Sequence, residues 1–248
     1  MSDNEAGTVT GIIDRNTLVL AVEGYAGRLS YVAGDSVELH CSSRASTFSV
    51  EVVSAGARPE VVHRAEGVTA DEHPVPADAY AVGARWPVAH RIATDASWRS
   101  GAYLVTLRAD GVDGPEAESH ALFAIRPGGP GTRLGDDRIL LVLATNTYNA
   151  YNKWGGACLY TGATSVSFRR PIERGFLVRP DADFDGRVAS TEPGGDPGHQ
   201  RLLAYLEAGR YPMWCASSGF HNWERRFLRW AEGTGFQVDV AVNSDLEE

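Results

Sequence analysis

The segment from Ala144 to Gly156 gathers polar and aromatic side chains directly after an apolar run, Ile139–Leu143. Three asparagines, two tyrosines, a lysine and a tryptophan lie between Asn146 and Trp154. A strand that ends in such a cluster is typical of α/β proteins, which place their chemistry at the carboxyl edge of a sheet. The alternative is a turn rich in Asn and Gly with solvated aromatic side chains. Composition alone leaves both interpretations open.

A second candidate is an acidic loop with the spacing of a twelve-residue calcium loop. Asp181, Asp183 and Asp185 occupy its first, third and fifth positions, Gly186 the sixth, and Glu192 the twelfth. Oxygen ligands at alternate positions can wrap a hard cation such as Ca²⁺. Prolines flank the segment and no helix is expected on either side, unlike in an EF-hand. We therefore expect a loop here, with bound calcium as the alternative.

His221 is the third candidate, because it lies at the start of an expected helix. Its imidazole could serve as an acid, a base or a ligand. The structural alternative is hydrogen bonding at the helix entry, with Asn222 as the N-cap residue. The three cysteines, Cys41, Cys158 and Cys215, have neither metal-like spacing nor the pattern of a disulfide framework. They predict no zinc site and no catalytic thiol.

Bulk properties limit the classes of function. The 248 residues carry a formal net charge of -9 and are 43% apolar, an ordinary globular balance. The negative charge argues against nucleic acid or an anionic membrane surface as a partner. The first residues are polar and acidic, so we expect no signal peptide and a cytoplasmic location. No apolar run approaches the length of a membrane span.

Two parts of the chain, which differ in sequence pattern, must position these candidate residues. Residues 8–126 contain short alternating segments separated by Gly, Asp and Ser, which predict an immunoglobulin-like antiparallel β-sandwich. The expected strands are Leu29–Val32, Val37–Cys41, Phe48–Val53, Tyr103–Arg108 and Ala121–Arg126. Residues 127–137 then read as a Pro- and Gly-rich linker.

From residue 138 to 248 the pattern predicts an α/β domain with a mainly parallel sheet. Strands are expected at 138–143 and 236–242, and helices at 198–206 and 222–232. In the second helix Trp223, Phe227, Trp230 and Ala231 fall on one face. Two strands and two helices do not bury a parallel sheet adequately. We therefore expect an incomplete domain that needs further polypeptide, a completing chain or a second copy of this chain.

Three blocks of the second half, in the right order, resemble the large (beta) subunit of N,N-dimethylformamidase and its relatives. The blocks are Thr145–Gly156 with Leu159–Tyr160, then Val166–Pro171, then Phe220–Glu224 continuing to Val242–Glu247. The resemblance covers about residues 138 to 248. The first half is similar to the β-sandwich that precedes the catalytic domain in such proteins.

This resemblance implies a mononuclear iron amidohydrolase that acts on a small amide. In the family two tyrosines and a glutamate hold the metal, which acts as a Lewis acid. Hard phenolate oxygens suit a ferric ion. The matching motif makes Tyr151 the expected ligand and Tyr148 the second, with Tyr160 as an alternative. Asn152, Lys153 and His221 are the catalytic candidates from the matching blocks.

One departure from the family is important. The glutamate ligand and a companion histidine lie in a His-x-Glu motif on the following strand, and this sequence contains no His-x-Glu. We therefore expect the chain to be the N-terminal portion of such an enzyme and to be inactive alone. Two alternatives stay open: a non-catalytic binding protein that uses the sandwich, and a calcium-stabilised structural module.

Overall fold

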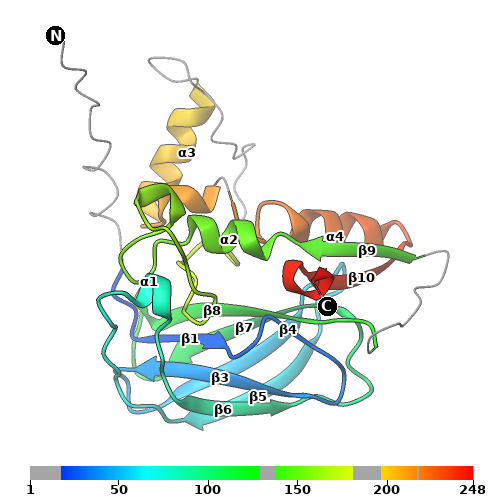
Figure 1. Ribbon diagram of the computed structural model, residues 1–248, viewed down its shortest axis with the longest axis horizontal. Coiled ribbons are helices and arrows are strands. Elements are labelled where there is room, and N and C mark those ends of the chain that lie inside the picture. Colours follow the sequence, from blue (N-terminus) through cyan, green and yellow to red (C-terminus); the bar gives the residue numbers. More distant parts are fainter. Residues whose placement is uncertain (1–17, 129–137, 181–196, 217, 248) are drawn as a thin grey trace.

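The computed structural model describes residues 18–128, 138–180, 197–216 and 218–247. A layered β-structure forms one side of the molecule, and most of the helices lie on the other side (Figure 1). The first part contains β1 (Val22–Ala26), β2 (Ser30–Tyr31), β3 (Ser36–Ser43), β4 (Phe48–Ser54), β5 (Val61–Val68), α1 (Ala79–Val82), β6 (Val88–Ala93), β7 (Gly101–Ala109) and β8 (Glu118–Ile125). The second contains β9 (Arg138–Leu143), α2 (Thr145–Tyr151), α3 (Pro197–Ala208), α4 (Glu224–Gly233) and β10 (Gln237–Val242).

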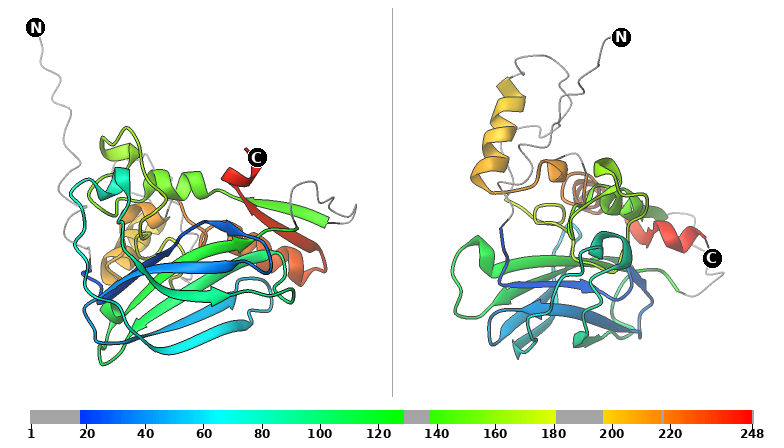
Figure 2. Two further views of the ribbon diagram at one scale, coloured as in Figure 1. Left: turned by 60° about the horizontal axis from the view of Figure 1, so that its bottom comes forward. Right: turned by 60° about the vertical axis from the view of Figure 1, so that its left-hand side comes forward.

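The first part consists of two sheets, with the strand orders β1-β3-β6 and β2-β8-β7-β4-β5. All pairs are antiparallel except β2–β8, which is parallel. The two layers lie face to face in both views of Figure 2. Apolar side chains from both sheets, among them Leu39, Phe48 and Phe123, form one buried cluster. The expected β-rich fold with antiparallel sheets is therefore confirmed.

Strand β7 is buried on both of its faces from Ala102 to Val105, which explains why these four residues are all apolar. Tyr103, Val105 and Leu107 belong to the sandwich core. Ala102 and Leu104 belong to a second cluster on the opposite face. Successive side chains of a strand point to opposite sides, so this sheet lies between two hydrophobic layers.

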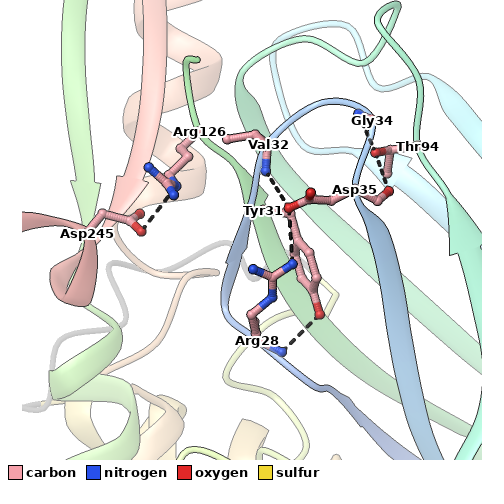
Figure 3. Close-up of polar contacts among 8 residues, drawn as sticks. All are labelled: Arg28, Tyr31, Val32, Gly34, Asp35, Thr94, Arg126 and Asp245. Atoms are coloured by element: carbon pink, nitrogen blue, oxygen red, sulfur yellow. Dashed lines mark hydrogen bonds and ion pairs between the residues drawn. The ribbon is translucent and has the colours of Figure 1, made fainter. Parts of the chain in front are cut away.

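Hydrogen bonds fix the turn between β2 and β3 to the end of β6 (Figure 3). The Asp35 carboxylate accepts hydrogen bonds from the Val32 backbone at 3.1 Å and from the Arg28 guanidinium at 3.1 Å. Gly34 has a φ of 99°, a conformation that favours glycine. Its N–H donates to Thr94 Oγ1 at 3.0 Å, and that hydroxyl donates to the Asp35 carbonyl at 2.7 Å. The turn thereby holds the edge of the sandwich in register.

In the second part, β9 and β10 pair in parallel over six residues, from Arg138 opposite Gln237 to Leu143 opposite Val242. The Arg138 guanidinium binds both carboxylate oxygens of the buried Asp239, at 2.5 and 2.6 Å. The sheet has two strands within the described residues. Among all the residues that the structure describes, no helix is long and apolar enough to cross a membrane.

Two local predictions differ from the structure. The segment after β9 forms a helix, α2, which was not among the expected helices. Helix α4 begins at Glu224 with Trp223 as the N-cap residue, so Asn222 does not cap it. Its buried side chains are Glu224, Leu228 and Ala231, whereas Trp223 and Trp230 are 48% and 57% exposed. Of the predicted apolar face, Ala231 is buried in the core and Phe227 packs against it, whereas the two tryptophans are exposed.

One hydrophobic cluster joins the two parts of the chain. It combines Leu104 and Leu122 of the sandwich with Phe176, Phe220 and other side chains of the second part. An ion pair between Arg126 and Asp245, with a nitrogen-to-oxygen distance of 3.6 Å, adds a polar contact (Figure 3). The second part therefore packs directly on the sandwich. Most of the predicted linker, residues 129–137, lies outside the described residues.

A histidine pair bridges the two edge strands β5 and β6, which belong to different sheets. The Nε2 atoms of His63 and His90 lie 2.9 Å apart. Burial lowers the pKa of both imidazoles, and the His63 imidazole lowers the pKa of His90 further. The two facing Nε2 atoms can share one proton in a hydrogen bond. Protonation of both rings would place two N–H groups against each other.

We expect the His63–His90 pair to make stability fall at acidic pH. A lowered histidine pKa means that the unfolded chain binds more protons, so this stabilisation is complete above about pH 6.5 and lost below it. The melting temperature should fall from about pH 7 to about pH 5. In His90→Gln this fall should be smaller, while His73→Gln should behave like the wild type. Equal falls in all three proteins would contradict the prediction.

Candidate functional site

Helix α2 is fixed at its start by side chains from far along the sequence. Its N-cap residue, Ala144, provides no side-chain cap. Instead the Ala144 N–H donates to Glu224 Oε1 at 3.1 Å, and the Asn146 N–H donates to Asn243 Oδ1 at 3.0 Å. These acceptors satisfy backbone donors that a helix leaves unpaired at its N-terminus. The helix thus starts at the carboxyl end of β9, where the sequence predicted the chemistry.

Tyr148 lies inside the core beside Glu224. Its side chain is 3% exposed, and Glu224 is 8% exposed. Burial, followed by the adjacent Glu224 carboxylate, raises the pKa of the Tyr148 phenol well above its ordinary value. Within the described part of the chain, neither Tyr148 Oη nor Glu224 Oε2 has a hydrogen-bond partner. The structure therefore places two buried oxygen atoms, each a possible metal ligand, close together.

Tyr151, the last residue of α2, stacks on Tyr160. Their ring centroids lie 4.2 Å apart with an angle of 15° between the planes. Trp214 completes the cluster, 5.2 Å from the Tyr151 ring. The neighbouring Tyr160 hydroxyl, and then burial, raise the pKa of the Tyr151 phenol. Tyr160 itself is 58% exposed. The structure thus brings together two phenol groups at the surface end of α2.

Asn152 and Lys153 hold the loop that follows α2. The Asn152 Nδ2 donates to the Pro171 carbonyl at 2.9 Å, and its Oδ1 accepts from the Trp154 and Glu173 backbones. The Lys153 N–H donates to Glu173 Oε2 at 2.9 Å. The Asn152 amide is buried and engaged at both ends, which is the arrangement of a residue that orders a loop.

Glu173 is a residue that the sequence did not single out. Burial raises the pKa of its carboxyl to about 7, opposed by the Lys153 N–H and the Arg170 charge. A carboxyl with this pKa can exchange a proton near neutral pH. It lines a cavity of about 10 Å³ together with His120 and Ser119. A cavity of this size can hold about one water molecule.

His221 is buried near the start of α4, with 3% of its side chain exposed. Its backbone N–H donates to the Phe176 carbonyl at 3.0 Å, and Nδ1 lies 3.1 Å from the Arg225 guanidinium. Its ring does not line the main cavity described below. The nearby residue that reaches α2 is Glu224, three positions later in the sequence.

The main cavity lies where the sandwich meets α2, with a volume of about 60 Å³. Side chains of β1 and β8 line one side, and α2 with the segment 168–177 lines the other. Most of the lining is apolar, including Tyr25, Leu122 and Phe168, and Tyr148 and Arg170 also border it. Its walls thus come from both parts of the chain.

The described side chains can be compared with the ligands that a metal ion needs. Among the described residues, no group of three or more His, Cys, Asp or Glu side chains could hold one. The phenol groups of Tyr151 and Tyr160 lie side by side, and phenolate oxygens are hard donors of the kind that a hard cation prefers. The acidic loop with Asp181, Asp183, Asp185 and Glu192 lies outside the described residues.

One comparison with known proteins, that with a family model, agrees with the resemblance in sequence. No curated protein matches this chain. A chain from a solved structure, titled "Structural basis of T cell specificity and activation by the bacterial superantigen toxic shock syndrome toxin-1", aligns with 11% identity and a TM-score of 0.27. The alignment covers 42% of this chain and 97% of that chain, and at this score it carries no argument. A family model described as "N,N-dimethylformamidase beta subunit-like, C-terminal" matches residues 50–248. The chain therefore belongs to the N,N-dimethylformamidase beta subunit-like family.

Proposed function

We propose that this chain carries part of the active site of an amidohydrolase that cleaves small amides such as N,N-dimethylformamide. The reaction adds water across the amide C–N bond and releases a carboxylate and an amine. The observation that supports this most directly is the stacked pair of Tyr151 and Tyr160 at the end of α2. The family match supports the chemical class.

In this proposal Tyr151 and Tyr160 provide two phenolate ligands to a ferric ion. Bound iron would supply Lewis-acid chemistry. Phenolate oxygens are hard donors, which suit a hard ferric ion. Tyr160 is the better partner for Tyr151, because the two rings stack while Tyr148 lies beside Glu224. Tyr148 with Glu224 is the alternative donor pair, since both have a buried oxygen without a partner in the described structure.

In this proposal the metal site is incomplete, and further polypeptide must supply the rest of it. The family's His-x-Glu motif is missing from this sequence, so the carboxylate ligand would come from elsewhere. Strands β9 and β10 would then be the first two strands of a larger parallel α/β sheet, beside an immunoglobulin-like sandwich. Parallel strands are normally covered on both faces, which favours further elements around this pair.

We expect the isolated chain to bind ferric iron but not to hydrolyse amides. Iron would be added to the purified protein, and the phenolate-to-iron absorption in the visible range recorded. Release of dimethylamine from N,N-dimethylformamide would then be measured with and without a polypeptide that carries the His-x-Glu segment. Turnover by the isolated, iron-loaded chain would disprove the incomplete site, and absence of the visible band would disprove the phenolate pair.

A further inference from the structure

Arg170 is a buried arginine whose guanidinium is surrounded by backbone carbonyl groups. Its side chain is 3% exposed. Nη2 donates to the carbonyls of Asn149 at 3.2 Å and Asn152 at 3.0 Å, and to Asn149 Oδ1 at 3.0 Å. Nη1 donates to the Trp154 carbonyl, and Nε donates to the Ser167 carbonyl at 2.9 Å. The group thus binds the chain on both sides of Tyr151.

The carboxyl end of α2 depends on such a partner. The helix has only seven residues, and isolated helices of this length are not stable. The last carbonyls of a helix have no partner within it. A guanidinium there satisfies several carbonyls at once and interacts favourably with the helix dipole. A lysine ammonium is a point charge without this planar fork.

Burial lowers the pKa of Arg170 to about 10, and the Glu173 carboxylate opposes this shift. The guanidinium therefore keeps its positive charge at neutral pH. Because the charged group is buried, its carbonyl partners must compensate the lost hydration. This requirement couples the position of the Arg170 side chain to the backbone around Tyr151.

We propose that Arg170 is the positioning residue of the Tyr151–Tyr160 pair: its guanidinium fixes the last turn of α2 and thereby holds the Tyr151 phenol against Tyr160. The inference rests on the proposed function, in which these two phenols bind iron. Arg170 acts through Tyr151 and does not itself touch the metal or the substrate.

Two variants of Arg170 and one matched control test this role in the purified chain. Arg170→Met removes every hydrogen bond, Arg170→Lys keeps the charge without the fork, and Arg169→Met alters the exposed neighbouring arginine. All proteins would carry fluorotyrosine, with the ¹⁹F resonances of Tyr151 and Tyr160 assigned from their phenylalanine variants. Circular dichroism would check that each variant is folded.

We expect the Tyr151 and Tyr160 resonances to shift in Arg170→Met, to shift less in Arg170→Lys, and to stay unchanged in Arg169→Met. Iron affinity in Arg170→Met should fall about 10–100-fold, the usual effect of losing a residue that orients a ligand. Unchanged resonances in a folded Arg170→Met protein would overturn the inference. If this variant does not fold, unchanged resonances in Arg170→Lys would do the same.

The two proposals can fail separately. The fluorine resonances report the position of Tyr151 without any metal. If they shift in Arg170→Met while the wild-type chain gives no iron-dependent visible band, the proposed function fails and the positioning role of Arg170 stands. If the band is present and equally strong in folded Arg170→Met and wild type, the iron site does not depend on Arg170 and the inference is wrong.

Discussion

Tyr151→Phe is expected to abolish the visible iron absorption of this chain and nearly all amide hydrolysis in the completed enzyme. The substitution removes one hydroxyl and keeps the ring that stacks on Tyr160 at 4.2 Å. The fold should therefore survive, and the loss should come from the missing ligand. Residues that only orient a ligand contribute about 10–100-fold to metal affinity or activity, so losing the ligand itself should cost about 100-fold or more.

Comparison of three phenylalanine variants identifies the ligand pair. We expect Tyr160→Phe to behave like Tyr151→Phe, and Tyr148→Phe to keep the visible band. Tyr148→Phe should also be at least as stable as the wild type, because the lost hydroxyl is buried beside Glu224 without a hydrogen-bond partner in the described structure. Iron titrations and dimethylamine release measure these effects. Loss of the band in Tyr148→Phe alone would assign the metal to Tyr148 and Glu224 instead.

The sequence predicted the strands that alternate clearly and missed those that depend on distant partners. Strand β3 follows an alternating pattern that is visible in the sequence. Strand β1 was missed, because Glu23 and Gly24 interrupt its apolar residues. In the structure Glu23 accepts a hydrogen bond at 2.9 Å from Trp154 Nε1, 131 positions away. Local pattern cannot reveal such a partner.

The contacts of Tyr151 could not be predicted from the sequence. The motif after β9 suggested a tyrosine at a strand end, whereas Tyr151 lies at the far end of α2. Its contact with Tyr160 requires the chain to reverse through Gly155 and Gly156, which have φ values of 81° and 114°. A Cβ atom at Gly155 would lie 2.9 Å from the Tyr80 nitrogen. The glycine pair was visible in the sequence, but the direction of the reversal was not.

Glu224 shows a further limit of sequence analysis. Glutamate is rarely buried, so a glutamate in the first turn of a helix is expected to face solvent. Here it faces inward, because the Ala144 N–H at the start of α2 needs an acceptor. Trp223 and Trp230 are exposed, although Phe227 and Ala231 of the same predicted face pack in the core. Tertiary hydrogen bonding overrides the amphipathic pattern at this position.

Phe220→Ala is expected to destabilise both parts of the chain together. The Phe220 side chain is fully buried in the cluster that also contains Leu104 and Leu122 of the sandwich. Its backbone cannot shift easily to fill a cavity. Gly219, with a φ of 107°, lies so close to the Phe176 carbonyl that a Cβ atom would be 2.5 Å from its oxygen. Replacing a core phenylalanine by alanine costs about 3–5 kcal/mol.

For a chain of this length, that loss corresponds to a fall in melting temperature of roughly 6–20 °C. Phe236→Ala is the matched control, because Phe236 is 47% exposed and its loss should cost less than about 1 kcal/mol. Calorimetry with near-ultraviolet circular dichroism would follow unfolding. Because the shared cluster contacts the sheet face of β7 and β8, we expect a single transition that moves as a whole. Two transitions, of which Phe220→Ala moves only one, would mean that the sandwich and the second part unfold independently despite their common core.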